Sequence, residues 1–258
     1  MGKIVAFSNQ KGGVGKTTTC VNMAAYLATK GYKCLIVDLD PQGNATTGLG
    51  FAKSDVKKSV YDTLIEDTSL ADVVVKTCID GLDLLPSNID LAGAEIELVY
   101  VKAREHALKK VLDQARDSYD FITIDCPPSL GLLTINALAA ADTVIIPIQS
   151  EYYALEGLSQ LMNTIKLVVK HLNPNLKIEG VVMTLNDNRA LISKQISEEI
   201  RKYFGKRVFD TVIPRNIRLA EAPSHGVPIM LHDTKCTGAR AYLALTEEFI
   251  ERQPKRNK

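Results

Sequence analysis

An apolar run, a glycine-rich loop and a helical pattern follow one another at the start of the chain. Residues 4–7 are Ile-Val-Ala-Phe, residues 11–18 are Lys-Gly-Gly-Val-Gly-Lys-Thr-Thr, and an amphipathic pattern begins at residue 17. Glycines let successive backbone N–H groups turn toward one anion, and a helix N-terminus adds partial positive charge. The order of strand, glycine loop and helix therefore predicts a phosphate-binding loop. A glycine turn that merely caps a helix is the weaker interpretation.

The side chains of this loop predict how a nucleotide is held. Lys16 is expected to reach the β- and γ-phosphates, and the Thr17 hydroxyl is expected to ligate Mg²⁺. The remaining loop residues form the expected cradle: Gly12, Gly13, Val14, Gly15 and Thr18. The common pattern G-x-x-x-x-G-K-[ST] places glycine at position 10, but this chain has Gln10 there, followed by Lys11. Lys11 adds one more positive charge than the cradling of a single nucleotide requires.

Composition restricts the class of protein. With 258 residues, of which 46% are hydrophobic, the chain suits one large α/β domain. The formal net charge is +1, so any contact with nucleic acid must come from a local basic patch. The five cysteines form no C-x-x-C pair and predict reduced thiols rather than a metal site or disulfides. We expect no signal peptide, and no apolar run approaches the ~18 residues of a membrane span.

Apolar runs and helical patterns alternate along nearly the whole chain. Most runs are continuous and rich in Val and Ile, as in strands that are buried on both faces of a parallel sheet. Strands are expected over 4–8, 34–38, 82–86, 121–125, 143–147, 178–184 and 208–213. Helices are expected over 17–30, 91–116, 130–140, 155–172, 192–204 and 239–252, with short helices in the less regular region 54–76. The alternation predicts a single doubly wound α/β domain of the P-loop NTPase type, with a mostly parallel sheet and helices on both faces.

Three aspartates stand at the carboxyl ends of predicted strands, where open α/β sheets bind their ligands. Asp125 ends the strand 121–125 after mostly apolar residues, which is typical of an acid that holds Mg²⁺ directly or through water. Asp38 and Asp40 end another strand, and their spacing of two puts both on one side of an extended segment. One could organise Mg²⁺ and the other could position an attacking water. A single aspartate at a strand end could merely cap a turn, but three together favour a catalytic cluster.

Five motifs together resemble the ParA/MinD family of P-loop ATPases over nearly the whole chain. They lie at residues 11–18, 38–43, 125–131, 151–157 and 213–216. The loop with the additional lysine resembles the deviant Walker A motif of that family, and the combination resembles its small chromosome-partitioning members, called Soj. On this resemblance, residues 1–251 are expected to form one ParA-like ATPase domain and residues 252–258 a basic, flexible tail.

The resemblance implies an ATP-dependent homodimer in which two subunits enclose two ATP molecules. Lys11 would reach the nucleotide of the partner subunit, much as an arginine finger does, and Lys16 would bind phosphates within its own subunit. Pro214 and Asn216 match the segment that contacts adenine in the family.

The same resemblance implies roles for the acidic cluster. Asp40 would orient the hydrolytic water, whereas Asp38 and Asp125 would support Mg²⁺ together with Thr17. Because positioning and electrostatics carry most of phosphoryl transfer, small displacements of these groups are expected to matter.

The resemblance also implies macromolecular partners. The ATP-bound dimer of the family binds double-stranded DNA without sequence preference, and Arg189 and Arg218 match positions that contact DNA in Soj-like proteins. A ParB/Spo0J-type protein stimulates hydrolysis in the family and so releases the dimer. We therefore expect a cytoplasmic, nucleoid-associated protein. The alternative for the basic residues around 189–218 is an ordinary solvated helix face.

Three other functions remain open from the sequence. A MinD-type membrane-cycling ATPase needs a larger apolar face than Phe249 and Ile250 offer before Pro254, so no stable membrane binding is expected. A nucleotide-gated scaffold would hydrolyse ATP only incidentally. A metabolic P-loop enzyme, such as a dethiobiotin synthetase relative, would need a small-molecule pocket, and no residues in the sequence indicate one.

Overall fold

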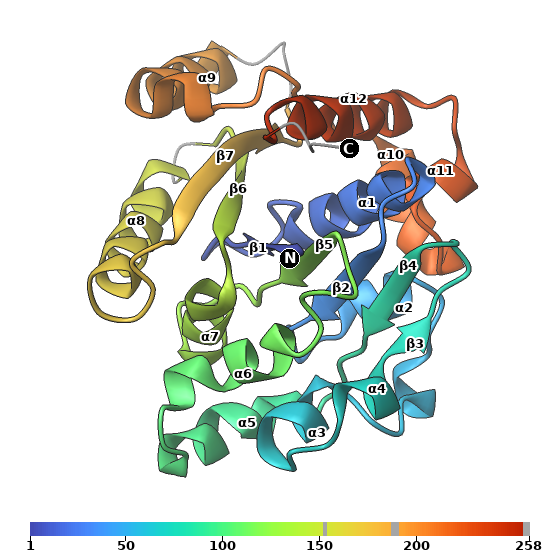
Figure 1. The fold of residues 1–258 in the computed structure, drawn as a ribbon. Coiled ribbons are helices and arrows are strands. Elements are labelled where there is room, and N and C mark those ends of the chain that lie inside the picture. Colours follow the sequence, from blue (N-terminus) through green and yellow to red (C-terminus); the bar gives the residue numbers. More distant parts are fainter. Residues whose placement is uncertain (152–153, 187–190, 255–258) are drawn as a thin grey trace.

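Within the described residues, seven strands form one sheet through the middle of the protein (Figure 1). The structure is a computed structural model that describes residues 1–151, 154–186 and 191–254, with the backbone alone for 154–156, 191–192 and 194. The strand order is β3-β4-β2-β5-β1-β6-β7, and every neighbouring pair is parallel except β3 and β4. The strands are β1 (Lys3–Phe7), β2 (Cys34–Asp38), β3 (Val75–Lys76), β4 (Leu82–Leu85), β5 (Phe121–Asp125), β6 (Thr143–Gln149) and β7 (Lys177–Thr184).

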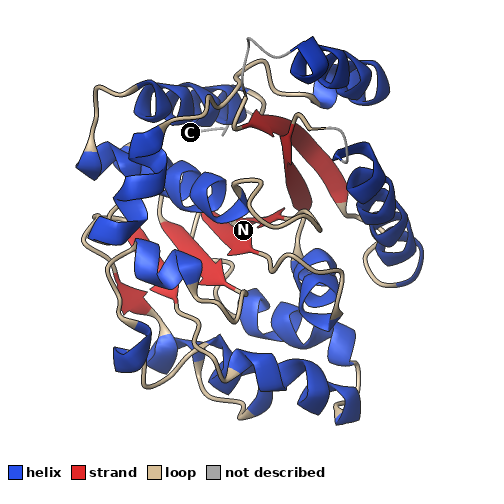
Figure 2. Ribbon diagram, turned by 180° about the vertical axis from the view of Figure 1, so that it is seen from behind, coloured by secondary structure: helices blue, strands red, loops and turns tan. Residues whose placement is uncertain are grey.

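Helices cover both faces of the sheet, as the alternating pattern predicts (Figure 2). One face carries α1 (Lys16–Thr29), α2 (Asn44–Gly48), α10 (Ile217–Glu221), α11 (Ile229–His232) and α12 (Thr237–Glu251). The other carries α3 (Val60–Ile65), α4 (Leu70–Val73), α5 (Leu91–Glu97), α6 (Ala107–Asp113), α7 (Leu132–Ala140), α8 (Ala154–His171) and α9 (Leu191–Phe204). Strand residues alternate between the two resulting cores: Ile4 and Ala6 of β1 enter one, and Val5 and Phe7 enter the other. The doubly wound α/β fold is therefore confirmed.

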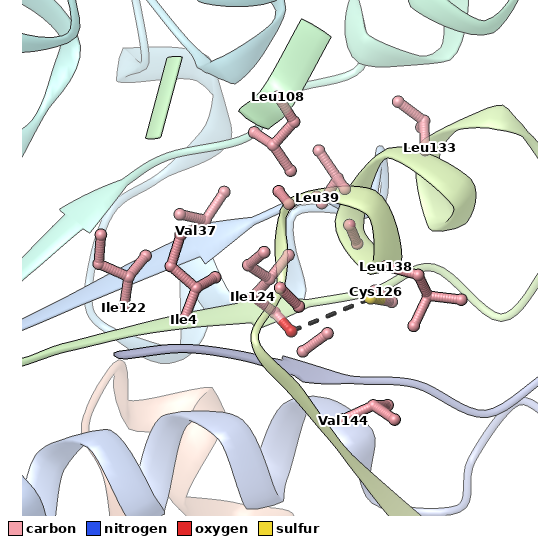
Figure 3. Close-up of a cluster of buried hydrophobic side chains, with 14 of the residues drawn as sticks. Ile4, Val37, Leu39, Leu108, Ile122, Ile124, Cys126, Leu133, Leu138 and Val144 are labelled. Atoms are coloured by element: carbon pink, nitrogen blue, oxygen red, sulfur yellow. Dashed lines mark hydrogen bonds between the residues drawn. The ribbon is translucent and has the colours of Figure 1, made fainter. Parts of the chain in front are cut away.

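The central strands are held by a dense apolar cluster (Figure 3). Ile4, Ile122 and Ile124 are fully buried there against Leu108 of α6 and Leu138 of α7. Close packing of this kind leaves strands little freedom to shift. It therefore fixes the carboxyl ends of β1, β2 and β5, where the predicted loop and aspartates lie.

The helix predicted over 91–116 is wrong in its middle. The segment contains α5, a 3₁₀ turn (Leu98–Tyr100), a second 3₁₀ turn (Arg104–His106) and α6. Ala103 has a left-handed φ of 53°, which breaks the helix. Asn136 of α7 stabilises the break because its amide donates to the Arg104 carbonyl (2.8 Å) and its oxygen accepts from the Leu108 N–H (3.1 Å). A buried side chain from a distant helix thus replaces the missing helical bonds.

The strand predicted over 208–213 is also absent from the described sheet. Phe209 and Ile213 are buried and donate backbone hydrogen bonds to β7, at the carbonyls of Val181 and Met183. Between them, the N–H groups of Asp210 and Thr211 turn away and donate to the Glu248 carboxylate of α12 (2.8 and 2.9 Å). Competition from this carboxylate interrupts the ladder, so an apolar run with strand composition becomes a loop that is buried only at its two ends.

The edges of the domain contain further short elements. Region 54–76 holds α3 and α4, which confirms the short helices expected there, and ends in the antiparallel strand β3, which the sequence did not predict. Two residues of the expected tail are anchored: Arg252 donates to the Val208 carbonyl, and Gln253 donates to Glu179. Residues 255–258 lie outside the described part. In that part, we find no helix with the length and apolarity needed to cross a bilayer.

Candidate functional site

The glycine loop between β1 and α1 has the backbone that a phosphate cradle needs. Gly13 and Gly15 have φ angles of 73° and 84°, which side-chain-bearing residues rarely adopt. The Gly15 carbonyl accepts from both the N–H and the hydroxyl of Thr19, so α1 begins directly after the loop. Val14 is buried, and its carbonyl accepts a hydrogen bond from the Thr184 hydroxyl of β7 (2.7 Å). The loop is thus held by hydrogen bonds from two elements, α1 and β7.

A cavity of about 410 Å³ lies at the loop, a volume typical of small-molecule sites. Eight of the predicted site residues line it: Gly12, Gly13, Gly15, Lys16, Thr17, Thr18, Asp40 and Asn216. Of the other residues predicted to bind the nucleotide, Lys11, Val14 and Pro214 are not among the described residues that line the cavity. Pro214 instead forms an isolated bridge with Asn186, beside the cavity wall at Ile213. The structure therefore brings the loop, the switch-like segment after β2 and the segment before α10 around one space.

Lys16 lies inside the loop, where its side chain is only 6% exposed. Its ammonium donates to the Lys11 carbonyl (3.1 Å). Burial lowers the pKa of Lys16, while the carboxylates of Asp125 and Asp40 oppose that shift. A buried ammonium at the floor of a cavity is well placed to attract an anion, because little water screens its charge.

Asp38 and Asp125 lie side by side as register partners on the neighbouring strands β2 and β5, and both are completely buried. Asp38 accepts from the Thr46 N–H (2.8 Å) and the Thr46 hydroxyl (2.7 Å), yet burial raises its pKa to about 6. Within the described residues, neither carboxylate oxygen of Asp125 has a hydrogen-bond partner. Burial, followed by the charge of Asp38, raises the pKa of Asp125 well above its usual range, and Thr17 and Lys16 oppose the shift.

This pair of carboxylates fits a magnesium ion. A buried acid without partners is a costly arrangement that a cation would relieve. No group of three or more acidic, histidine or cysteine side chains suited to a metal occurs in the described chain. Mg²⁺ commonly needs no such group, because it takes one or two carboxylates and completes its shell with phosphate and water oxygens. Asp125 and Asp38, with the Thr17 hydroxyl nearby, are the residues that would hold it.

Asp40 lies at the rim of the cavity, two residues beyond Asp38. Its carboxylate accepts from the Gln42 N–H (2.9 Å), and its backbone carbonyl accepts from the Ser87 hydroxyl (2.8 Å). The side chain is nearly buried but borders the cavity. This is a position from which a carboxylate could hold a water near bound phosphate.

Lys11 lies outside the cradle. Its ammonium forms an ion pair with Glu151 at 2.5 Å, with about a third of the side chain exposed. Its N–H donates to Asn9, whose amide in turn donates to the Pro147 carbonyl. The two lysines of the loop therefore lie in different places: Lys16 borders the cavity, and Lys11 is held at the surface beside the end of β6.

The two predicted DNA-contacting arginines have different outcomes. Arg189 lies outside the described residues. Arg218 is 52% exposed on α10 and pairs with Glu221 (2.8 Å) and Asp233 (3.7 Å). The same helix contributes Leu219 and Ala220 to the cavity wall, and Asn216 caps it by accepting from the Arg218 N–H. Arg218 is therefore one residue away from the nucleotide cavity along the chain.

Several cavity residues were missed from the sequence: Asn44, Thr47, Pro128, Thr184, Leu185, Ile213, Leu219, Ala220, Pro223 and Tyr242. Thr184 ends β7, so the rule that singled out the aspartates could have found it. Leu185 has a left-handed φ of 49°, a strained conformation that no sequence signal marks. Tyr242 reaches the cavity from α12 near the end of the chain, and only the packing of α12 on α1 brings it there.

Comparison with known proteins gives the chain its relatives. A protein family described as AAA domain matches residues 2–178. The sporulation initiation inhibitor protein Soj of Bacillus subtilis is 58% identical over 96% of this chain and 98% of its own length. The chromosome partitioning protein ParA of Myxococcus xanthus is 52% identical over 98% of this chain and 89% of its own. A Mycobacterium smegmatis structure described as cobyrinic acid a,c-diamide synthase with bound ADP and magnesium is 39% identical, with a TM-score of 0.84, and covers 96% of this chain and 93% of that one.

Proposed function

Since the chain belongs to the ParA/MinD family of P-loop ATPases and is a partitioning ATPase of the Soj/ParA type, we propose that ATP joins two copies into a dimer that binds DNA. Its activity is the hydrolysis of ATP, with Mg²⁺ as the metal cofactor. Hydrolysis causes the dimer to dissociate and to release the DNA. The protein thus cycles between one subunit and two, and the cycle moves a chromosome or plasmid.

The site residues divide the chemistry among them. Lys16 and the loop N–H groups bind the β- and γ-phosphates, and Asn216 borders the space for adenine. Pro214 is proposed to support the adenine segment from beside the cavity, where it bridges to Asn186. Asp40 accepts a hydrogen bond from the attacking water and orients it toward the γ-phosphorus, with ADP as the leaving group.

The acidic pair holds the metal. Asp125, Asp38 and Thr17 hold Mg²⁺, which, when bound, neutralises charge on the phosphate oxygens. The two carboxylates are buried and lie on neighbouring strands, so the packed sheet keeps them in register. This rigidity suits a reaction that depends on position and charge.

The observation that carries the dimer proposal is the position of Lys11. One lysine of the loop borders the cavity, whereas Lys11 lies outside it and pairs with Glu151 at the surface. A nucleotide bound in this cavity is served by Lys16 of the same chain. Lys11 is available instead to the nucleotide of a second subunit, where it would stabilise charge on the transferred phosphoryl group as an arginine finger does.

DNA binding is proposed to follow from dimerisation. With a net charge of +1, one subunit offers little general attraction to DNA, so local patches must act together. Pairing two subunits doubles the number of patches and raises the effective affinity without new contacts. Arg218 belongs to such a patch and shares α10 with the cavity wall, and Arg189 is proposed to join it.

A ParB-type protein is the second proposed partner, after DNA. A ParB/Spo0J-type protein accelerates hydrolysis on the DNA-bound dimer, and the protein is accordingly placed in the cytoplasm on the nucleoid. A steady-state ATPase assay with DNA and a ParB-type protein tests this. An ATPase rate that rises when DNA and the ParB-type protein are both present supports the cycle. An ATPase rate that neither of them changes would favour a nucleotide-gated scaffold.

Two alternatives make different predictions. A MinD-type membrane cycle predicts that the protein sediments with anionic liposomes when ATP is present. The Mycobacterium smegmatis neighbour is named for a metabolic enzyme, and that function predicts ATP turnover that depends on a small-molecule substrate. The identity of 58% to Soj over nearly both whole chains favours partitioning.

A further inference from the structure

The buried end of β4 is attached to the catalytic segment by an unusual set of hydrogen bonds. Ser87, two residues beyond β4, is completely buried, as are Thr46 and Asp38. All three stand close together although they come from β2, α2 and the loop after β4. Burying a polar group costs free energy unless the group forms a hydrogen bond. The hydrogen bonds of these three residues therefore indicate which parts of the site they hold in position.

The first part of the set holds Asp38. The Ser87 N–H donates to the Thr46 hydroxyl oxygen (2.9 Å), and the same hydroxyl donates to Asp38 Oδ2 (2.7 Å). The Ser87 N–H can only donate, so it occupies the acceptor side of the hydroxyl and leaves its proton for the carboxylate. Thr46 therefore gives Asp38 a charge-assisted bond in addition to that of its own N–H.

The second part holds Asp40. The Ser87 hydroxyl donates to the Asp40 carbonyl (2.8 Å), which also accepts from the Gly43 N–H (2.8 Å). Gly43 has a φ of 56°, and a Cβ there would stand 3.2 Å from the Ser87 carbonyl. Two groups of Ser87, its N–H and its hydroxyl, thus bond the segment 40–46, and the bond from the hydroxyl fixes the carbonyl of Asp40 itself.

We infer that Thr46 and Ser87 are positioning residues of the ATPase: Thr46 orients Asp38 toward the metal, and Ser87 orients Asp40 toward the attacking water. The inference rests on the roles proposed above for Asp38 and Asp40. Asp125, which has no such donors among the described residues, needs the cation itself, whereas Asp38 is held ready for it by protein groups. The two residues do not line the cavity and act only through the aspartates.

The test separates metal binding from turnover. Thr46→Val removes the hydroxyl with little change of shape, and Thr46→Ser keeps it. Ser87→Ala removes the hydroxyl bond to Asp40 together with a longer contact to the Asn88 carbonyl (3.5 Å). Thr63→Val is the control, because Thr63 is also buried and its hydroxyl bonds only a helix carbonyl. Melting temperatures without nucleotide report folding. Binding of a fluorescent ADP analogue, in EDTA and across a Mg²⁺ titration, reports the metal site independently of hydrolysis.

Thr46→Val should bind the analogue in EDTA within about twofold of the unmodified protein, because the phosphate loop is intact. It should need about tenfold to a hundredfold more Mg²⁺ for the metal-dependent increase in affinity, as expected for the loss of a hydrogen bond to a charged group. Thr46→Ser should restore the ordinary requirement. Ser87→Ala should keep that requirement and lower kcat by about three- to thirtyfold.

The results also separate this inference from the proposed function. If Asp38→Asn raises the Mg²⁺ requirement but Thr46→Val does not, the positioning role is overturned while the metal site stands. If Asp38→Asn also leaves the requirement unchanged, the metal assignment fails and the inference fails with it. A Thr46→Val variant that merely loses as much melting temperature as Thr63→Val, with unchanged Mg²⁺ requirement and kcat, would reduce Thr46 to a structural residue.

Discussion

Replacing Asp125 by asparagine should stabilise the nucleotide-free protein and abolish its response to Mg²⁺. Asp125 is completely buried, its oxygens have no hydrogen-bond partner among the described residues, and Asp38 lies beside it on β2. An unsatisfied buried polar group costs about 1–3 kcal/mol, and more when it is charged. Asparagine keeps the shape and stays polar, so it removes only the additional cost of the charge and its repulsion from Asp38. We expect the free energy of unfolding to rise by about 1–3 kcal/mol where Asp125 is ionised. For a chain of this length that is about 2–10 °C in melting temperature.

The pH dependence of this effect has a defined sign. The pKa of Asp125 is raised well above its usual range and that of Asp38 to about 6, so between about pH 4 and those values the native state binds more protons than the unfolded state. The stability contributed by these groups therefore falls as pH rises through that window. The advantage of Asp125→Asn should be small at pH 5 and larger at pH 7.5.

Thermal unfolding in EDTA, followed by circular dichroism at both pH values, measures the effect. Asp83→Asn is the control: Asp83 is also nearly buried in the sheet, but it pairs with Lys76 and accepts from the Tyr119 hydroxyl, so its loss should destabilise. With ADP present, added Mg²⁺ should raise the melting temperature of the unmodified protein and leave Asp125→Asn unchanged. An Asp125→Asn protein that is less stable than the unmodified one in EDTA at pH 7.5 would exclude an uncompensated charge at Asp125. An Asp125→Asn protein that still responds to Mg²⁺ would exclude the metal role of this residue.

Three other variants test the remaining roles. Lys16→Ala should weaken ATP binding by at least about tenfold, because it removes a charged donor from the cavity, and equilibrium dialysis that finds tight binding retained would remove the phosphate-loop assignment. Asp40→Ala should trap an ATP-bound, DNA-binding dimer, and normal turnover in a phosphate-release assay would exclude its role in orienting water. Arg189→Glu combined with Arg218→Glu should abolish DNA binding but not dimerisation. Arg104→Glu changes a partly exposed arginine that is also ion-paired, and this variant should retain DNA binding. Fluorescence anisotropy at increasing salt measures this, since phosphate contacts weaken steeply with salt.

Local patterns predicted the parts of this protein whose structure is determined locally. Strands such as β2 and β5 are continuous apolar runs buried on both sides, and the loop of residues 11–18 carries its own glycine geometry. The errors occur where a distant side chain competes with the local preference. Glu248 captures the N–H groups of an apolar run, and Asn136 stabilises a break in a helical one.

The candidate site shows the same division. Lys16, Asp40 and Asp125 follow from motif and strand-end position, and the structure places them around one cavity or its buried floor. Part of the cavity wall comes from Leu219 of α10 and Tyr242 of α12, which follow Lys16 by 203 and 226 residues in the chain. The hydrogen-bonded group of Thr46 and Ser87 joins segments 41 residues apart. No local pattern encodes such pairings, because only the packed sheet and helices bring the segments together.

If Lys11 reaches the nucleotide of a second subunit, the bound nucleotide controls the number of subunits. Light scattering coupled to size-exclusion chromatography, with a non-hydrolysable ATP analogue or with ADP, measures this number. We expect a dimer with the ATP analogue and a monomer with ADP for the unmodified protein, and a monomer in both cases for Lys11→Ala, which should still bind the analogue. Lys30→Ala removes a lysine of similar exposure that is also ion-paired, and it should dimerise normally. A dimer that forms equally well without Lys11 would exclude the trans role of this lysine, and an unmodified protein that stays monomeric with the ATP analogue would exclude nucleotide-controlled dimerisation.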